Sequence, residues 1–159
     1  MSIEYRLKIT VLSAGNKAVD CSAIIKWAET WDWGVGEIVA NRLGSNNFKD
    51  WETVFIITID EQYAGLCILE KKDGWGTDLD PALTPFITVV YVDPKFRGRR
   101  LCEKLLGAAS DFAHSLGFDA VYLISSEKGF YEKFGFEKYA QTVTLSGTTE
   151  PVYKKCIFL

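Results

Sequence analysis

Apolar and polar positions follow patterns along this chain that predict strands separated by helices. Runs of branched and aromatic residues, or alternation with a period of two, predict strands at 4–11, 53–59, 63–71, 86–92, 120–124, 136–145 and 152–158. The run at 53–59 is apolar on both faces and is expected to be central, whereas 4–11 alternates and is expected to be half buried. The continuous apolar run at 120–124 is typical of a buried parallel strand, and a helical crossover separates it from 86–92.

Helical spacing of apolar residues predicts helices between these strands. The longest, over 101–116, keeps apolar residues at spacings of three and four and is closed by Gly117. Asp20 is the expected N-cap of a first helix, and glycines interrupt the pattern before a shorter helix over 37–43. A further short helix is expected between 125 and 134. The pattern therefore predicts a mixed α/β chain without internal repeats.

The most informative stretch runs from Val89 to Leu101. A run of branched and aromatic residues ends at Pro94, and a basic turn with three arginines then leads into the long helix. No Ser, Thr, Asp or Asn stands at the cap position, expected at Arg97 and Gly98, so the first backbone N–H groups of the helix lack a side-chain cap. These N–H groups, the helix dipole and the arginines predict a site for an anion, phosphate in particular. A water-capped helix start with incidental charge is the alternative.

Composition narrows the function classes. The chain has 159 residues, 48% of them hydrophobic and 25% charged, which is typical of one soluble globular domain. Its formal net charge of −3 argues against a dedicated nucleic-acid partner. The four cysteines have no metal-ligand spacing and the single histidine, His114, lies within a helix, so no metal site and no catalytic role for His114 is expected. No signal-peptide core or membrane-length apolar run occurs, so we expect a cytoplasmic protein with no membrane partner.

Two segments and the order of the elements resemble the GCN5-related N-acetyltransferase (GNAT) family. The segments are Val90-Tyr91-Val92-Asp93-Pro94-Lys95-Phe96-Arg97-Gly98 and Phe130-Tyr131-Glu132-Lys133-Phe134-Gly135-Phe136. The resemblance covers nearly the whole chain and implies a single domain over 1–159 with the GNAT fold, a mixed, mostly antiparallel sheet with a central parallel strand pair and flanking helices. Arg100 and Cys102 stand where the family usually has small residues, and Ile124 stands where it often has asparagine.

The resemblance implies an acetyl-CoA-dependent N-acetyltransferase that needs no metal and works by direct attack in a ternary complex. Tyr131 matches the tyrosine that protonates the departing thiolate. Main-chain groups of the strand and of the basic turn would bind acetyl-CoA, and Arg100 would add a side-chain contact. The implied cofactor-binding residues are Val90, Tyr91, Val92, Arg97, Gly98, Arg99, Arg100, Leu101, Cys102 and Glu103.

The acceptor is expected to be a primary amine, either a small molecule or, as a variant, a protein N-terminus or lysine. The candidates for holding or deprotonating it are Asp78, Asp80 and the segment Trp31-Asp32-Trp33, where aromatic faces beside an acid suit a cation. Solvated carboxylates, packed tryptophans and a water acting as base are the alternatives. A non-catalytic acyl-CoA-binding or regulatory module on the same fold is the second functional hypothesis. The oligomeric state stays open, with a homodimer among the alternatives.

Overall fold

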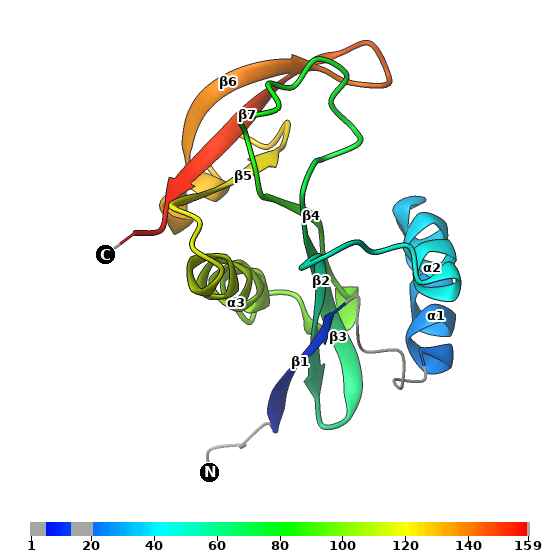
Figure 1. Ribbon diagram of the computed structural model, residues 1–159. Helices are drawn as coiled ribbons and strands as arrows, with labels where there is room; N and C mark the ends of the chain where they lie inside the picture. Colours follow the sequence, from blue (N-terminus) through cyan, green and yellow to red (C-terminus); the bar gives the residue numbers. More distant parts are fainter. Residues whose placement is uncertain (1–5, 14–20, 159) are drawn as a thin grey trace. The chain divides into compact units, whose positions relative to one another are not determined.

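The computed structural model describes residues 6–13 and 21–158. Within them the elements are, in chain order, β1 (Leu7–Ser13), α1 (Ser22–Glu29), α2 (Val35–Ser45), β2 (Thr53–Ile59), β3 (Gln62–Glu70), β4 (Phe86–Val92), the 3-10 helix η1 (Pro94–Phe96), α3 (Leu101–Ser115), β5 (Ala120–Ile124), the 3-10 helix η2 (Tyr131–Phe134), β6 (Glu137–Val143) and β7 (Thr149–Cys156) (Figure 1). The predicted bounds of 53–59, 86–92 and 120–124 are confirmed at both ends. The expected N-cap, Asp20, lies outside the described residues.

The chain forms two compact units, Met1–Ile68 with Val89–Leu105 and Leu69–Thr88 with Leu106–Leu159. Hydrogen-bonded strands follow the order β1-β2-β3-β4 in the first unit and β4-β5-β7-β6 in the second, because β4 contributes residues to both. The pair β4–β5 is parallel, with Phe86 opposite Tyr122, while β1–β2, β5–β7 and β6–β7 are antiparallel. The predicted mixed sheet with one parallel pair is therefore confirmed, and the single domain over 1–159 stays a prediction.

In the first unit, α1 and α2 lie side by side (Figure 1) and share an apolar cluster with β2, β3 and β4. Gly36 allows their close approach, because a Cβ at this position would lie 2.1 Å from the Ala28 carbonyl oxygen. The prediction that glycines delay the second helix until residue 37 is wrong, since α2 begins at Val35 and includes Gly36 and Gly44. Asn46 ends it in the left-handed conformation, with φ 52°.

Strand β1 pairs with β2 along its whole length, from Leu7 opposite Ile59 to Ser13 opposite Thr53. The expected half-buried strand forms, but its buried side chain is Leu12, which joins the cluster under α1 and α2. Leu7 and Val11, on the face expected to be apolar and buried, are 37% and 44% exposed. Sequence alternation thus located this strand but indicated the wrong face, because the helices cover the side on which Leu12 lies.

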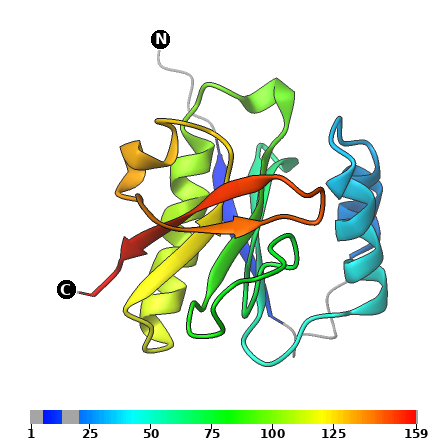
Figure 2. The same cartoon turned by 90° about the horizontal axis from the view of Figure 1, so that it is seen from above.

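In the second unit, the hairpin β6–β7 lies beside β5 (orange, red and yellow in Figure 2). Strand β7 begins at Thr149 rather than at the expected residue 152, and β6 contains a register shift between Lys138 and Ala140. The predicted end of α3 at Gly117 is confirmed, because Gly117 has φ 95° and the N–H of Phe118 donates to the Ala113 carbonyl at 3.1 Å. None of the described helices is long and apolar enough to cross a membrane.

The contact at Gly36 leads to a stability prediction with a control in the same helix. Replacing Gly36 with alanine should lower the free energy of unfolding by about 1–3 kcal/mol, because the new Cβ pushes α2 away from the Ala28 carbonyl. Gly44→Ala should instead leave stability unchanged or raise it by up to about 1 kcal/mol, because its Cβ would only touch Ile25 at 3.9 Å. Urea unfolding of both variants checks this; equal stability of the two would show that the helices do not depend on the close approach.

Candidate functional site

A buried carboxylate, Asp93, holds the turn that leaves β4. Its Oδ1 accepts from the backbone N–H of Lys95 at 3.0 Å and caps η1, and its Oδ2 accepts from the indole N–H of Trp27 in α1, also at 3.0 Å. The backbone N–H of Asp93 donates to the Ala64 carbonyl in β3 at 2.7 Å. Because a buried carboxylate is costly unless hydrogen-bonded, these bonds fix the turn against two other elements of the first unit.

The turn places α3 so that Arg100, and not Arg97 or Gly98 as expected, precedes the first helical residue. The helical hydrogen bonds begin with the N–H of Lys104 donating to the Arg100 carbonyl at 3.3 Å. Gly98 has φ 84° and Arg100 has φ 58°, so the backbone is left-handed twice within three residues. Such a conformation favours glycine and costs an arginine about 1–2 kcal/mol, which gives a physical reason for the small residue that the family resemblance led us to expect at this position.

The three arginines of the turn lie in different surroundings. The Arg97 Nε donates to the Val92 carbonyl at 2.9 Å, and the Arg99 guanidinium lies over the Phe96 ring at 5.4 Å from its centroid. The Arg100 side chain is 85% exposed and lies 3.8 Å from the Glu103 carboxylate, a weak surface pair. The start of α3 therefore presents an exposed cation beside the positive end of the helix dipole.

An aromatic stack connects two sets of residues that the sequence placed in different roles. Tyr91, expected to bind the cofactor, stacks on Trp31 at a centroid distance of 3.9 Å and on Trp33 at 6.4 Å, both expected to bind substrate. Trp31 is buried and Trp33 is 43% exposed, so Trp31 supports the stack and Trp33 forms its surface. The buried indole N–H of Trp31 has no hydrogen-bond partner among the described residues.

Asp32 joins this stack to the basic turn. Its Oδ1 accepts from the Tyr91 hydroxyl at 3.2 Å and lies 3.7 Å from the Arg97 Nη2, while the Arg97 guanidinium also lies 5.8 Å from the Tyr91 ring centroid. Burial, together with the Asp32 carboxylate, raises the pKa of Tyr91 to about 12, so its phenol stays a hydrogen-bond donor at neutral pH. The structure thus brings Asp32, Tyr91 and Arg97 together.

The backbone of β4 is strained next to this stack. Val89 has φ 53°, an unusual value for a β-branched residue, and it directly precedes Val90, Tyr91 and Val92. Strained positions of this kind persist where the surrounding structure holds them and occur often at functional sites. The strain marks the segment that was expected to pair with the cofactor arm.

Tyr131 lies in the second unit, at the start of η2. Its ring is half-buried and contacts Phe130 at 5.0 Å, Phe136 at 6.1 Å and Tyr153 at 6.2 Å between centroids. Gly135 ends η2 with φ 91°, as the sequence predicted. These contacts hold the ring in one orientation, and the role of Tyr131 as proton donor stays a prediction.

Asp78 and Asp80 hold the loop between β3 and β4. Asp78 Oδ1 accepts from the Thr142 hydroxyl at 2.6 Å and from the Val143 N–H at 3.0 Å, and these hydrogen bonds lower the pKa of Asp78. Asp80 Oδ1 accepts from the Ala82 N–H at 2.9 Å. Both carboxylates serve the loop geometry, and a substrate role for either stays a prediction.

Sequence patterns did not single out Asp73, which lies in the same loop. Burial raises the pKa of Asp73 to about 6, against the lowering effect of a hydrogen bond from the Trp75 N–H, and the charges of Glu70 and Glu150 raise it further. Glu70 also accepts a short hydrogen bond from the Thr88 hydroxyl. A carboxyl group with a pKa this close to neutral is a candidate proton acceptor. Glu70 is close in sequence, but only folding buries Asp73 and brings Glu150 near it, so the sequence carried no clear signal for the shift.

The cysteines and carboxylates provide no metal centre in the part of the chain that the structure describes. No group of three or more His, Cys, Asp or Glu residues within 6–13 and 21–158 could hold a metal ion. Cys67 is buried, its Sγ lies 3.7 Å from the Leu105 carbonyl, and burial raises the pKa of its thiol. It is therefore an inert core residue.

Comparisons with known proteins show the family and the fold. The family model of the acetyltransferase (GNAT) domain matches residues 50–138. An acyl-CoA N-acyltransferase from Pseudomonas aeruginosa superposes with a TM-score of 0.68 at 16% identity, covering 95% of this chain and 100% of that one. Spermidine N-acetyltransferase from Vibrio cholerae gives a TM-score of 0.63 at 13% identity, covering 94% and 93%.

A third similar structure contains the expected co-substrate. A protein from Bacillus anthracis assigned as a streptothricin acetyltransferase, solved in complex with acetyl coenzyme A, gives a TM-score of 0.57 at 18% identity, covering 69% of this chain and 65% of that one. Identities this low show a shared fold. A search of curated protein sequences finds no match to this chain.

The raised pKa of Asp73 predicts a pH-dependent effect of Asp73→Asn. Asp73 loses its proton near pH 4 in the unfolded chain but only near pH 6 in the folded chain, so the native protein loses stability as the pH rises through this window. Asparagine keeps an acceptor for the Trp75 N–H and carries no charge. The variant should be more stable than the native protein above pH 6, by on the order of 2 kcal/mol, and the gain should vanish below pH 4. Urea unfolding across pH 4–8 checks this, and a gain independent of pH would contradict it.

Proposed function

Because this chain belongs to the GNAT acetyltransferase family, we propose that it transfers an acetyl group from acetyl-CoA to a primary amine of a small molecule. The observation that carries this proposal is the segment from β4 to α3. It combines a strained strand, a turn fixed by Asp93 and an arginine-rich helix start with left-handed residues at Gly98 and Arg100. These are the parts that an acetyl-CoA site needs at its pantetheine and pyrophosphate ends.

The residues of the basic turn would hold the pyrophosphate. Backbone N–H groups from Arg97 to Glu103 lie at the positive end of the α3 dipole, where phosphate is favoured. The exposed Arg100 side chain adds a charge to that end. Main-chain groups of Val90, Tyr91 and Val92 would pair with the pantetheine arm as an added strand.

In the proposed reaction the neutral amine attacks the thioester carbonyl carbon and forms a tetrahedral intermediate. A backbone N–H of β4 would donate to its oxyanion, a contact worth about 3–4 kcal/mol in other enzymes. The intermediate collapses by breaking the carbon–sulfur bond, the thiolate takes a proton, and the amine nitrogen loses one. Tyr131 is the proposed proton donor on the basis of its sequence motif, and Asp73 or a water is the proposed acceptor.

The aromatic stack of the first unit is the proposed contact for the acceptor amine. Trp33 presents an exposed indole face next to the Asp32 carboxylate, and both features attract a cation.

The proposal is tested by measuring thiol release from acetyl-CoA with a panel of primary amines. Amine-dependent release by the purified full chain is the expected result. Binding of acetyl-CoA without thiol release for any amine would favour the non-catalytic acyl-CoA-binding module. Arg100 and Cys102, which stand where the family usually has small residues, are the sequence features in favour of that alternative.

Replacing Tyr131 with phenylalanine should separate chemistry from binding. The variant keeps the ring contacts and loses the hydroxyl, so kcat should fall about 100-fold while the Kd for acetyl-CoA stays the same. Tyr122→Phe, in the core of the same unit, is the matched control and should retain activity. Unchanged turnover of the Tyr131 variant would remove this residue from the mechanism.

Arg100 permits a test with two substitutions that remove the same charge. Both Arg100→Gly and Arg100→Ala should weaken acetyl-CoA binding by about 3- to 10-fold at low salt, because each removes one exposed cation. Only glycine relieves the left-handed backbone, so the glycine variant should be about 1 kcal/mol more stable than the alanine variant. Calorimetric titration and urea unfolding measure the two effects; unchanged affinity in both variants would show that Arg100 acts through its backbone alone.

A further inference from the structure

The aromatic stack of the first unit ends in a ring that is open to solvent. Trp31 lies 3.9 Å from Tyr91 between ring centroids with an interplanar angle of 16°, and Trp33 lies 6.4 Å from Tyr91 with an angle of 19°. The three rings are therefore nearly parallel. Trp31 and Tyr91 are 8% and 5% exposed, whereas Trp33 is 43% exposed. The stack thus continues from the core to the surface, where part of the Trp33 indole is accessible.

Contacts below the surface hold the inner rings of this stack in place. Trp27 contacts Trp31 edge-on at 5.1 Å between centroids, and the Tyr91 hydroxyl donates to the Asp32 carboxylate at 3.2 Å. Neither inner ring can turn without breaking these contacts, so Trp33 packs on a fixed support. A surface that is already ordered loses little conformational freedom when a ligand packs on it, and this favours binding.

The charges next to the stack are balanced. The Asp32 carboxylate lies 3.7 Å from the Arg97 guanidinium, whose Nε donates to the Val92 carbonyl at 2.9 Å and so stays beside the strand. One negative and one positive charge leave no net charge to attract a second ammonium group. An acceptor with one amine and an uncharged remainder is therefore more complementary to this surface than a polyamine.

Tyr91 connects the stack to the strand proposed to hold acetyl-CoA. Its ring belongs to the stack, while its main chain lies between Val90 and Val92 in the segment proposed to pair with the pantetheine arm. Trp33, Asp32 and this segment of β4 all belong to the first unit. An acceptor that packs on Trp33 therefore lies next to the residue whose main chain would bind the cofactor arm.

We propose that Trp33 selects the acceptor by stacking on an aromatic ring, so that the preferred substrates are primary amines that carry one aromatic ring and no further charge. The ring of the acceptor forms the next layer on the Trp33 indole, and the amine of the same molecule receives the acetyl group. Stacked rings attract each other beyond the effect of their buried apolar area. This inference rests on the proposed acetyl transfer and adds the substrate class to it.

The test compares phenylethylamine with cyclohexylethylamine, which has the same amine and linker and a saturated ring. For the native protein, kcat/KM from thiol release should be about 3- to 10-fold higher with phenylethylamine, the factor that a stacked ring pair adds to the burial of apolar area. Diaminobutane, which carries a second ammonium group in place of the ring, should give the lowest kcat/KM of the three amines, because Arg97 offsets the charge of Asp32.

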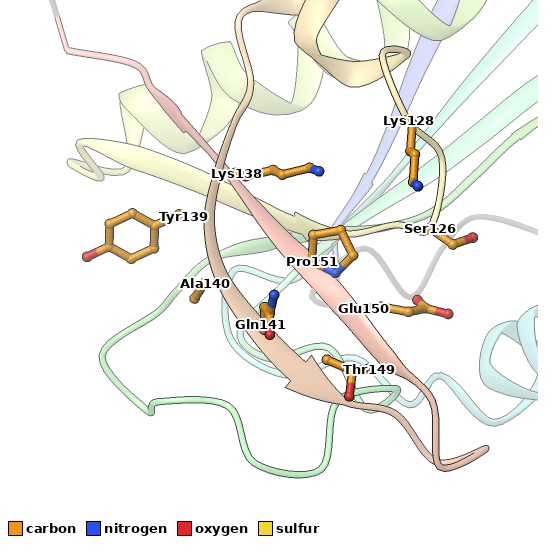
Figure 3. A pocket seen from close by; sticks show the side chains of 9 residues that line it. All are labelled: Ser126, Lys128, Lys138, Tyr139, Ala140, Gln141, Thr149, Glu150 and Pro151. Carbon is orange, nitrogen blue, oxygen red and sulfur yellow. The ribbon is translucent and has the colours of Figure 1, made fainter.

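Variants at Trp33 separate the ring from its apolar bulk. In Trp33→Leu the preference for phenylethylamine should disappear through a higher KM for that amine, with the KM for acetyl-CoA unchanged, whereas Trp33→Phe keeps a ring and should retain the preference. Tyr139→Leu is the matched control, because Tyr139 is a 55% exposed aromatic residue of the second unit. In Figure 3, which shows a pocket lined by β6, β7 and the segment after β5, its ring points away from the other labelled side chains. This control should keep the native preference.

Three results would overturn the proposal: equal use of phenylethylamine and cyclohexylethylamine by the native protein, an equal loss for both amines in Trp33→Leu, or a higher kcat/KM for diaminobutane than for phenylethylamine. Calorimetric titration of phenylethylamine into native and Trp33→Leu protein covers the case of no turnover. Binding that depends on Trp33, without thiol release for any amine, would overturn the acetyl transfer and keep the aromatic site. Thiol release with other amines, but neither binding nor release with phenylethylamine, would overturn the aromatic preference alone.

Discussion

The hydrogen bonds of the Asp93 carboxylate determine how β4 leaves the sheet of the first unit. One oxygen is bonded to α1 through Trp27 and the other to the first turn after the strand, and the backbone of Asp93 is bonded to β3. A carboxylate this deeply buried would be too costly without such partners, so the strand exit, α1 and the start of α3 are mutually fixed. The stack of Tyr91 on Trp31 and the pairing of Arg97 with Asp32 both depend on that placement.

Backbone strain is concentrated on either side of this turn. Left-handed residues other than glycine elsewhere in the described chain are Asn, Asp or Glu at Asn46, Asp50, Asp60 and Glu61, whereas Val89 and Arg100 have side chains that resist this conformation. Both flank the segment proposed to bind acetyl-CoA. Val89 packs against the apolar cluster that contains Trp31 and Tyr91, and such packing holds a strained residue in place.

The second unit contributes titratable carboxyl groups. Its loop between β3 and β4 is attached to β6 by Asp78, and this attachment accompanies the burial of Asp73 near Glu70 and Glu150. One unit therefore supplies a rigid aromatic and arginine-rich surface, and the other supplies titratable groups.

The sequence by itself determined the elements and the motifs, because these depend on local patterns. Strands β2, β4 and β5, the end of α3 at Gly117, the basic turn and the Tyr131 motif follow from residue period, turn chemistry and family resemblance. It did not determine which side chains meet. From sequence, Gly36 was expected to interrupt a helix, whereas in the structure it lies within α2 and packs against Ala28. The sequence also did not indicate that the Trp31 ring is buried and the Trp33 ring exposed. The shifted pKa of Asp73 was decided by tertiary structure, because its burial and the proximity of Glu150 arise from segments far apart in the chain.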